Sequence, residues 1–320
     1  MNSVGGYFEL ELRKGKEYHP NAIALNTGRN ALELILKVKK YKKVYIPYYT
    51  CYVILEPFEK TKISYEFYSI DKNFEPIFDY NLLNSEDGFL YTNYFGLKDR
   101  FIEELANECS NLIIDNSQAF FSAPINNIPT FYSCRKFFGV PDGAYLYLDN
   151  IIEFDFPIDN SEDRFSHLLK RIDLGAEEGY KTYKENENNL VGQPIKQMSI
   201  LTRALLRNID YKKVIKIRKE NFLYYQQNLS LVNDFNIIMD KETVPMNYPF
   251  FSKKNKLKQL LINNKIFIPT YWPNVISWSD KNSLEYIFST KMIFLPIDQR
   301  YDNDNISKIV KIIKSNNHEH

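Results

Sequence analysis

The segment YSCRKFFGVPDGAYLY (residues 132–147) places Lys136 between two apolar runs. The first run, TFYSC (130–134), has the aromatic and β-branched composition of a buried strand, and the second, GAYLYL (143–148), alternates as a strand does. We therefore predict that Lys136 follows the end of a buried strand. Most lysines in a protein of this size lie on the surface, so this segment by itself gives Lys136 no function.

Upstream of this segment, short apolar runs alternate with amphipathic stretches. The stretch RNALELILKVKK (29–40) has Leu32, Ile35 and Leu36 on one helical face, and Thr27 is placed to cap it. By the same reasoning we predict a second helix at 98–109 and strands at 43–46, 63–68, 88–92 and 112–115. This alternation is typical of an α/β fold with a mostly parallel sheet flanked by helices.

The second half of the chain differs from the first. Residues 161–229 are rich in Lys, Glu and Asn with several helical patterns, and the helix predicted at 211–229 is the longest. Its predicted buried stripe is Val214, Ile217, Phe222, Tyr225 and Leu229. We predict short strands at KIFIP (265–269) and MIFLP (292–296) and a last helix at 306–314. These patterns indicate a large α/β domain over 1–210, then a linking helix and a small α+β domain over 211–320.

Composition limits the function classes. The 41 Lys and Arg nearly balance the 40 Asp and Glu, so the chain lacks the basic footprint of a nucleic-acid-binding protein. No long apolar run predicts membrane insertion, and the first residues lack the apolar core of a signal peptide. Three separated cysteines and four histidines favour neither a disulfide framework nor a metal site, and they suit the cytoplasm.

Polar residues follow several of the predicted strands. Asp115 ends one strand, Ser133 and Lys136 follow another, and Thr27 to Asn30 begin a helix. Ligands of α/β sheets bind at the carboxyl ends of the strands. We therefore expect these segments to converge on one crevice.

Six segments together resemble the DegT/StrS family of sugar-nucleotide aminotransferases, which depend on pyridoxal 5'-phosphate (PLP). They are LNTGRNALELIL (25–36), VYIPYYTCYVIL (44–55), LIIDNSQAF (112–120), residues 132–147, KIRKENFLYYQQNL (216–229) and LPIDQRYDNDNISKIV (295–310). Their joint order and spacing cover nearly the whole chain. The resemblance implies the aspartate-aminotransferase fold (fold type I), with a large domain built on a seven-stranded type of sheet, and a homodimer.

The resemblance also implies roles for individual residues. Lys136 is the counterpart of the lysine that forms the Schiff base with PLP and moves the substrate proton. Asp115 pairs with the pyridine nitrogen, and Gln118 contacts the ring hydroxyl oxygen. The phosphate is held by Thr27, Gly28, Arg29, Asn30 and Ser133 at a helix N-terminus. Each residue also has a plainer interpretation: a surface lysine, a turn aspartate, a surface amide and an ordinary capped helix.

The chain departs from the family pattern at three places. Cys51 occupies the position where the family stacks an aromatic ring on PLP, and Tyr49 or Tyr52 are the alternatives. Gln193 and Lys196, within Gly192–Lys196, match the segment by which the partner subunit reaches the phosphate, with Lys in place of Arg. Arg135, beside Lys136, is a candidate partner for a phosphate or a substrate carboxylate, or else a solvent-facing residue.

The resemblance implies amino transfer to a keto-sugar nucleotide, with glutamate as the donor, in cell-surface polysaccharide or O-antigen biosynthesis. The departures keep a second hypothesis open, namely a catalytically altered or non-enzymatic relative with a regulatory or assembly role. A third class, dehydration, is disfavoured because some dehydratases of the family lack the lysine that is present here as Lys136.

Overall fold

The computed structural model describes residues 4–149, 155–236, 238–252 and 256–318, and its centre is an eight-stranded sheet. The strand order is β1-β8-β7-β6-β5-β2-β3-β4. The strands are β1 (Ile23–Leu25), β2 (Lys43–Pro47), β3 (Ser64–Ile70), β4 (Pro76–Ile77), β5 (Asp87–Thr92), β6 (Leu112–Asp115), β7 (Thr130–Ser133) and β8 (Ala144–Tyr147). This confirms the predicted α/β class with a large, mostly parallel sheet.

Strand direction determines where the sheet can bind a ligand. Strands β7, β6, β5, β2 and β3 are parallel neighbours. Strand β8 is antiparallel to both β7 and β1, so β1 runs in the same direction as the parallel set. The carboxyl ends of six strands therefore lie along one edge, where α/β proteins bind their ligands.

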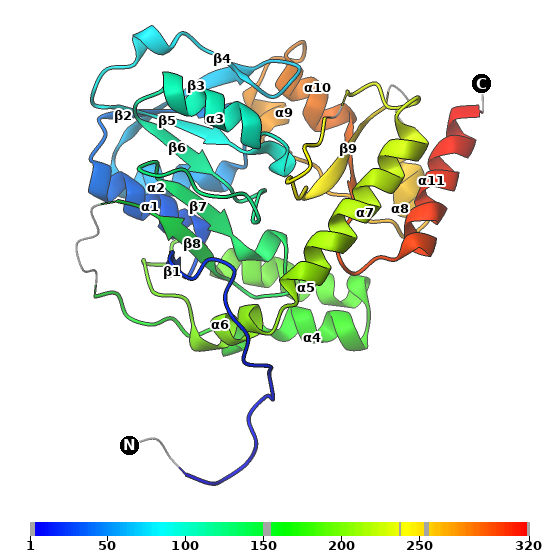
Figure 1. Cartoon of the computed structure of the whole chain (residues 1–320), viewed down its shortest axis with the longest axis horizontal. Coiled ribbons are helices and arrows are strands. Elements are labelled where there is room, and N and C mark those ends of the chain that lie inside the picture. The colour runs from blue at the N-terminus through cyan, green and yellow to red at the C-terminus, as the bar shows by residue number, and fades with distance from the viewer. Residues whose placement is uncertain (1–3, 150–154, 237, 253–255, 319–320) are drawn as a thin grey trace.

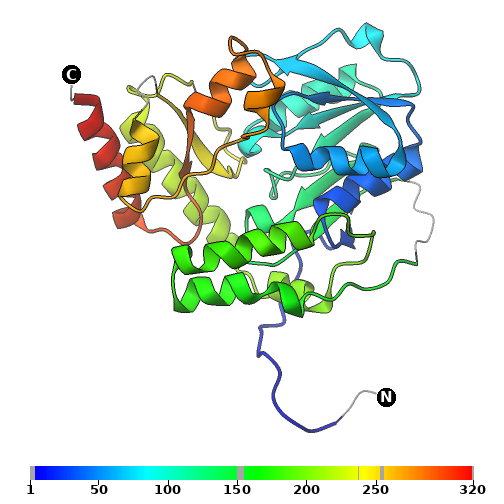
Figure 2. The same ribbon diagram turned by 180° about the vertical axis from the view of Figure 1, so that it is seen from behind.

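Helices cover both faces of the sheet, as Figure 1 and the reverse view in Figure 2 show. On one face, α1 (Gly28–Lys39) and α2 (Leu55–Thr61) pack on Val44, Ile46 and Leu90. On the other face, α3 (Asp99–Glu108) packs on a core that includes Phe89 and Tyr91. Successive strand residues point to opposite faces, so one strand such as β5 supplies both cores.

The C-terminal third forms a separate small core around a two-stranded antiparallel sheet. Its strands are β9 (Asn247–Phe251) and β10 (Met292–Pro296). The helices α7 (Tyr211–Leu229), α8 (Leu257–Asn263) and α11 (Asn303–His318) pack on this sheet. Shorter helices complete the chain: α4 (Ser166–Asp173), α5 (Ala176–Asn189), α6 (Ile200–Arg207), α9 (Val275–Trp278) and α10 (Leu284–Lys291).

Two local predictions in this region are wrong. Residues 265–269 have no regular secondary structure and follow α8, because a short apolar run can be buried without pairing as a strand. In α7 the stripe of four buried apolar residues is present, but Ile217 is only partly buried and Arg218, at 1% exposure, takes the inner position. A fully buried arginine is contrary to the usual preference of charged residues for solvent.

Candidate active site

A cavity of about 190 Å³ opens at the carboxyl edge of the sheet. Thr50 and Cys51, which follow β2, line this cavity together with Thr92, Asp115 and Ser133, which end β5, β6 and β7. The parallel arrangement brings these residues together although they are far apart in sequence. The crevice expected from the strand ends is therefore present.

Helix α1 presents its N-terminus to the same cavity. Thr27, Gly28 and Arg29 line the cavity, and the Thr27 hydroxyl caps the helix by accepting a hydrogen bond from the Asn30 N–H at 3.1 Å. The N–H groups of Gly28 and Arg29 precede the hydrogen-bonding pattern of the helix, which leaves them available to an anion.

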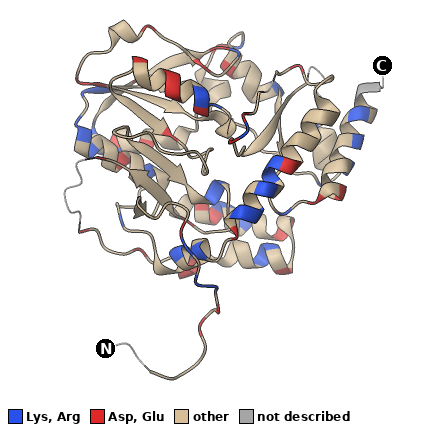
Figure 3. Cartoon of the chain, viewed as in Figure 1, with Lys and Arg blue, Asp and Glu red and all other residues tan. Residues whose placement is uncertain are grey.

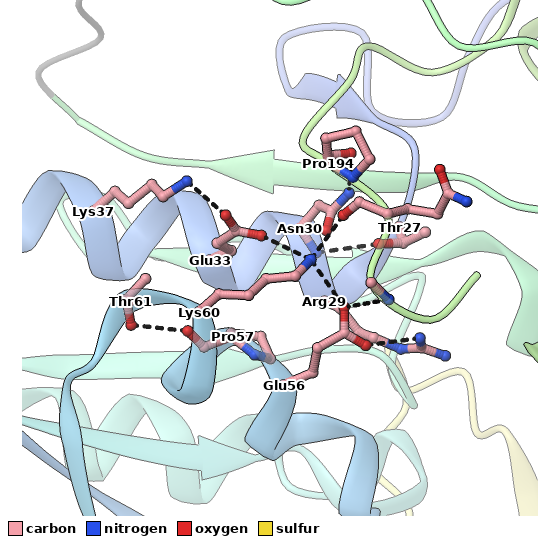
Figure 4. Close-up of polar contacts among 12 residues, drawn as sticks. Thr27, Arg29, Asn30, Glu33, Lys37, Glu56, Pro57, Lys60, Thr61 and Pro194 are labelled. Carbon is pink, nitrogen blue, oxygen red and sulfur yellow. Dashed lines mark hydrogen bonds and ion pairs between the residues drawn. The ribbon is translucent and has the colours of Figure 1, made fainter. Parts of the chain in front are cut away.

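Ion pairs hold this helix end in place, as Figure 4 shows. Arg29 pairs with Glu56 at 3.0 Å, Lys60 bridges Glu56 and Glu33, and Glu33 also pairs with Lys37. Arg29 donates a further hydrogen bond to the Leu190 carbonyl at 2.9 Å. The Arg29 side chain is thus committed to structure, and its backbone is the part left for binding.

Asp115 is a buried carboxylate on the cavity wall, with 6% exposure. One of its oxygens accepts a hydrogen bond from the Ser117 N–H at 2.8 Å. Burial raises the pKa of Asp115 above its ordinary value, while hydrogen bonds from Ser117 and the charge of Lys136 oppose this rise. A cationic partner in the cavity would stabilise the charged carboxylate.

Lys136 lies just after β7, as the sequence predicts, and its side chain lines the cavity while remaining largely exposed. In the described part of the chain, its ammonium group makes no hydrogen bond or ion pair, and it lies 6.0 Å from the centre of the Tyr271 ring. A primary amine without a hydrogen-bonding partner, beside a buried carboxylate, is suited to react with a carbonyl group.

Gln118 and Gly143 shape the wall near these two residues. The Gln118 side-chain oxygen accepts a hydrogen bond from the Phe95 N–H at 2.9 Å, which fixes the amide at the cavity. Gly143 has φ +103°, and a Cβ built there would lie 2.9 Å from the Thr202 methyl carbon. Glycine is therefore required at the turn that follows the Lys136 loop.

Two residues predicted for the cofactor, Asn30 and Tyr52, lie outside the cavity, and Gln193 and Lys196, predicted to reach the phosphate of the partner subunit, make contacts within this chain. The Asn30 N–H is already bonded to Thr27, and its side chain donates to Asn26 and to the Pro194 carbonyl. Tyr52 is 60% exposed. Gln193 donates to the Asn189 carbonyl, and Lys196 pairs with Asp159 at 2.9 Å. The other alternative for a stacking ring, Tyr49, is fully buried among aromatic side chains and does not line the cavity.

The cavity contains a group that the sequence did not reveal. Glu187, near the end of α5, forms an ion pair with Arg135, and both residues line the cavity with Tyr183 and Trp272. Burial raises the pKa of Glu187, but Arg135, Lys136 and Arg29 together bring it below its ordinary value. No local motif marks Glu187 among the many Lys, Glu and Asn residues of its helix.

Charges elsewhere on the described chain are mixed. Figure 3 shows both signs on the same helices, α7 included. No helix among the described residues is long and apolar enough to cross a membrane. Within those same residues, no group of three or more His, Cys, Asp or Glu side chains is arranged to hold a metal ion.

Comparison with known proteins gives little at the level of sequence. No protein-family model matches the chain. One curated protein, the DNA-directed RNA polymerase subunit beta'' of Oedogonium cardiacum, is 27% identical over 131 residues, which are 40% of this chain. The chain spans about 5% of the length of that subunit, so the match does not bear on the activity of this protein.

Comparison with solved structures gives the fold. DesV of S. venezuelae has a TM-score of 0.67 at 14% identity, over 93% of this chain and 85% of its own. A DegT DnrJ EryC1 StrS aminotransferase from Brucella abortus has a TM-score of 0.64 at 14% identity, over 93% of this chain and 86% of its own. The putative sugar aminotransferase Spr1654 from Streptococcus pneumoniae, in its PLP form, has a TM-score of 0.64 at 16% identity, over 92% of this chain and 86% of its own. The chain therefore has the fold of the PLP-dependent sugar aminotransferases of the DegT/DnrJ/EryC1/StrS type.

Proposed function

We propose that this protein is a PLP-dependent aminotransferase. The observation that carries the proposal is one cavity, at the carboxyl edge of the sheet, that is lined by Lys136, Asp115 and the start of α1. The residues fit the cofactor: the amine of Lys136 has no ion-pair partner in the described chain, Asp115 is a buried carboxylate, and two helix N–H groups are available. The similarity of fold to structures solved in PLP form supports this choice.

Each part of the cofactor has a candidate binding group. Lys136 would hold the aldehyde carbon, Asp115 the ring nitrogen and Gln118 the ring hydroxyl oxygen. Gly28, Arg29, Thr27 and Ser133 would hold the phosphate, and Cys51 lies against the cavity in place of a stacking aromatic ring. When bound, PLP supplies an electron sink for the bond that breaks at the amino-bearing carbon.

The protein's own residues move protons and exclude water. The Nζ atom of Lys136, once it is not bonded to the cofactor, would take a proton from the amino-bearing carbon of the donor. In the second half of the cycle the same atom would deliver a proton to the acceptor carbon. Asp115 favours a protonated ring nitrogen because burial makes an unpaired carboxylate costly. Trp272, at 8% exposure, and Leu190, at 2% exposure, contribute apolar wall that excludes water from the reacting atoms.

For substrates, we propose a keto-sugar nucleotide as acceptor and glutamate as donor, in cell-surface polysaccharide or O-antigen biosynthesis. The family resemblance supports this choice, as do the fold neighbours described as sugar aminotransferases from Micromonospora echinospora and Streptococcus pneumoniae. We further propose a cytoplasmic homodimer, with a large PLP-binding domain over 1–210 and a small domain over 211–320. Three free cysteines are consistent with a reducing compartment.

The test is the absorption spectrum of the purified protein with PLP. We expect a band of the bound cofactor that glutamate shifts, and a Lys136→Ala variant that lacks both the band and the shift. Lys184→Ala, an exposed lysine on α5, is the matched control. A protein that never takes up PLP would overturn the proposal, and a screen of keto-sugar nucleotides would follow a positive result.

A second candidate function is a non-enzymatic relative that keeps the scaffold. The Arg135–Glu187 pair in the cavity and the ion pair of Lys196 with Asp159 favour it, because each places an internal carboxylate on a cation that is a candidate for binding a ligand. Glutamate discriminates the two. The enzyme converts bound PLP to its amine form, whereas the altered relative lacks PLP or binds it without that conversion.

A further inference from the structure

Glu187 is an unusual neighbour for a site expected to bind a phosphate. Its carboxylate lies in the cavity, paired with Arg135, while the positive charges of Lys136 and Arg29 also act on it. These three cations line the same cavity as the N-terminus of α1, where the two available N–H groups are found. Glu187 thus occupies the electrostatic position of an anionic ligand.

Two observations place Glu187 in the same cavity as the candidate phosphate-binding groups. The Leu190 carbonyl, at the end of α5, accepts a hydrogen bond from Arg29 at 2.9 Å, so the end of α5 meets the start of α1. Arg135 follows Ser133 by two residues, and both line the cavity with Thr27. The Glu187 carboxylate and the candidate phosphate donors therefore line one cavity, and the contact of Arg29 with Leu190 joins the elements that carry them.

Arg135 has donor capacity that its ion pair does not use. One terminal nitrogen meets Glu187, and the guanidinium lies 6.0 Å from the centre of the Tyr183 ring. The buried Nε atom has no hydrogen-bond partner among the described residues. A planar guanidinium with free N–H groups is suited to a phosphate, which accepts two parallel hydrogen bonds.

We propose that Arg135 is an anion-binding residue for a phosphate group and that Glu187 is its built-in competitor, displaced when the phosphate binds. The proposal rests on the proposed function for the identity of the natural ligand but concerns a different pair of residues. A bound phosphate and the Glu187 carboxylate compete for the same guanidinium, so any change that withdraws Glu187 tightens phosphate binding.

The test measures binding of inorganic phosphate and of PLP by calorimetry and absorbance. We expect Glu187→Gln and Glu187→Asp to bind both about three- to tenfold more tightly than the unchanged protein, as the loss of a partly buried ion-pair competitor implies. The aspartate variant keeps the charge but withdraws it from Arg135. Glu185→Gln, an exposed glutamate on the same helix, is the matched control and should change nothing.

A double-mutant cycle with Arg135→Gln distinguishes competition between Glu187 and phosphate for Arg135 from direct charge repulsion between Glu187 and phosphate. If Glu187 acts by occupying Arg135, its replacement has a much smaller effect when Arg135 is absent. Equal tightening with and without Arg135, or no tightening in Glu187→Gln and Glu187→Asp, would overturn the proposal. Circular dichroism establishes that each variant is folded before binding is measured.

Comparing several ligands identifies the molecule that carries the phosphate and distinguishes a failure of this subsite from a failure of the proposed function. Tightening for PLP but not for pyridoxal, which has no phosphate, assigns the subsite to the cofactor. Tightening for a nucleoside diphosphate on the PLP-loaded protein assigns it to the substrate. If the Glu187 variants bind inorganic phosphate more tightly but no variant ever binds PLP, the phosphate subsite is supported and the proposed aminotransferase function is not.

Discussion

At the scale of single residues, Asp115 is a buried carboxylate whose charge opposes the folding of the chain. The carboxylate is buried at the end of β6, and burial raises its pKa because the charged form loses contact with water. A group with a raised pKa in the folded state favours folding when it is protonated and opposes it when it is ionised. At neutral pH and without a ligand, Asp115 therefore lowers the stability of the chain.

We predict that Asp115→Asn raises the free energy of unfolding of the cofactor-free protein at pH 7 by on the order of 1 kcal/mol. The gain should shrink as the pH falls through the raised pKa of Asp115, because the unchanged carboxyl is then protonated as well. Urea unfolding at several pH values measures this. A variant less stable than the parent at pH 7 would contradict the prediction, and PLP binding should be weaker in either case.

At the scale of elements, the start of α1 combines a structural cap with a candidate binding surface. The Thr27 hydroxyl accepts a hydrogen bond from the Asn30 N–H. The N–H groups of Gly28 and Arg29, which precede Asn30, remain available at the cavity. The ion pairs of Arg29 with Glu56 and of Lys60 with Glu33 join α1 to α2. Capping and side-chain pairing together hold the helix end that would bind an anion.

We predict that Thr27→Ala lowers the free energy of unfolding by about 1 kcal/mol and weakens phosphate binding, because the helix loses its cap. Thr27→Ser keeps the hydroxyl and should retain most of both. Denaturant unfolding and phosphate calorimetry on the two variants test the prediction. A loss in Thr27→Ser as large as that in Thr27→Ala would show that the methyl group, rather than the cap, matters at this position.

At the scale of the whole molecule, Arg218 joins the C-terminal core to the loop after Lys136. It is 1% exposed and donates to the Pro245 and Met246 carbonyls at 3.3 and 3.0 Å and to the Gln299 side chain at 3.2 Å. Its guanidinium lies 4.5 Å from the centre of the Phe137 ring. Burial lowers its pKa to about 10, so it stays charged at neutral pH.

We predict that Arg218→Met lowers the free energy of unfolding by about 2 to 4 kcal/mol, because two buried carbonyls lose their donor. Lys216→Met, an exposed position on the same helix, should change it by less than about 0.5 kcal/mol. Guanidinium unfolding of both variants gives the comparison. Similar values for the two would mean that the hydrogen bonds of Arg218 contribute no net stability.

Much of the architecture follows from local sequence. The strand and helix periods predict the order of elements, and strand ends bring Asp115, Ser133 and Lys136 to one edge because parallel strands share a direction. The predicted cap at Thr27 is present for the same reason, since it depends only on residues three positions apart. The run at 265–269 shows the limit, because local composition does not decide whether a segment finds a pairing partner.

By itself, then, the sequence determined the α/β class, the strand ends and the cap, all of which depend on neighbouring residues. Only the tertiary structure decided that Glu187 enters the cavity opposite Arg135, that Arg218 is buried, that the Asn30 side chain donates to the Pro194 carbonyl, and that Lys196 pairs with Asp159. These contacts join residues tens of positions apart, or set a side chain between two elements. Such pairings depend on how elements pack, and a periodic pattern carries no information about the partner on the other side.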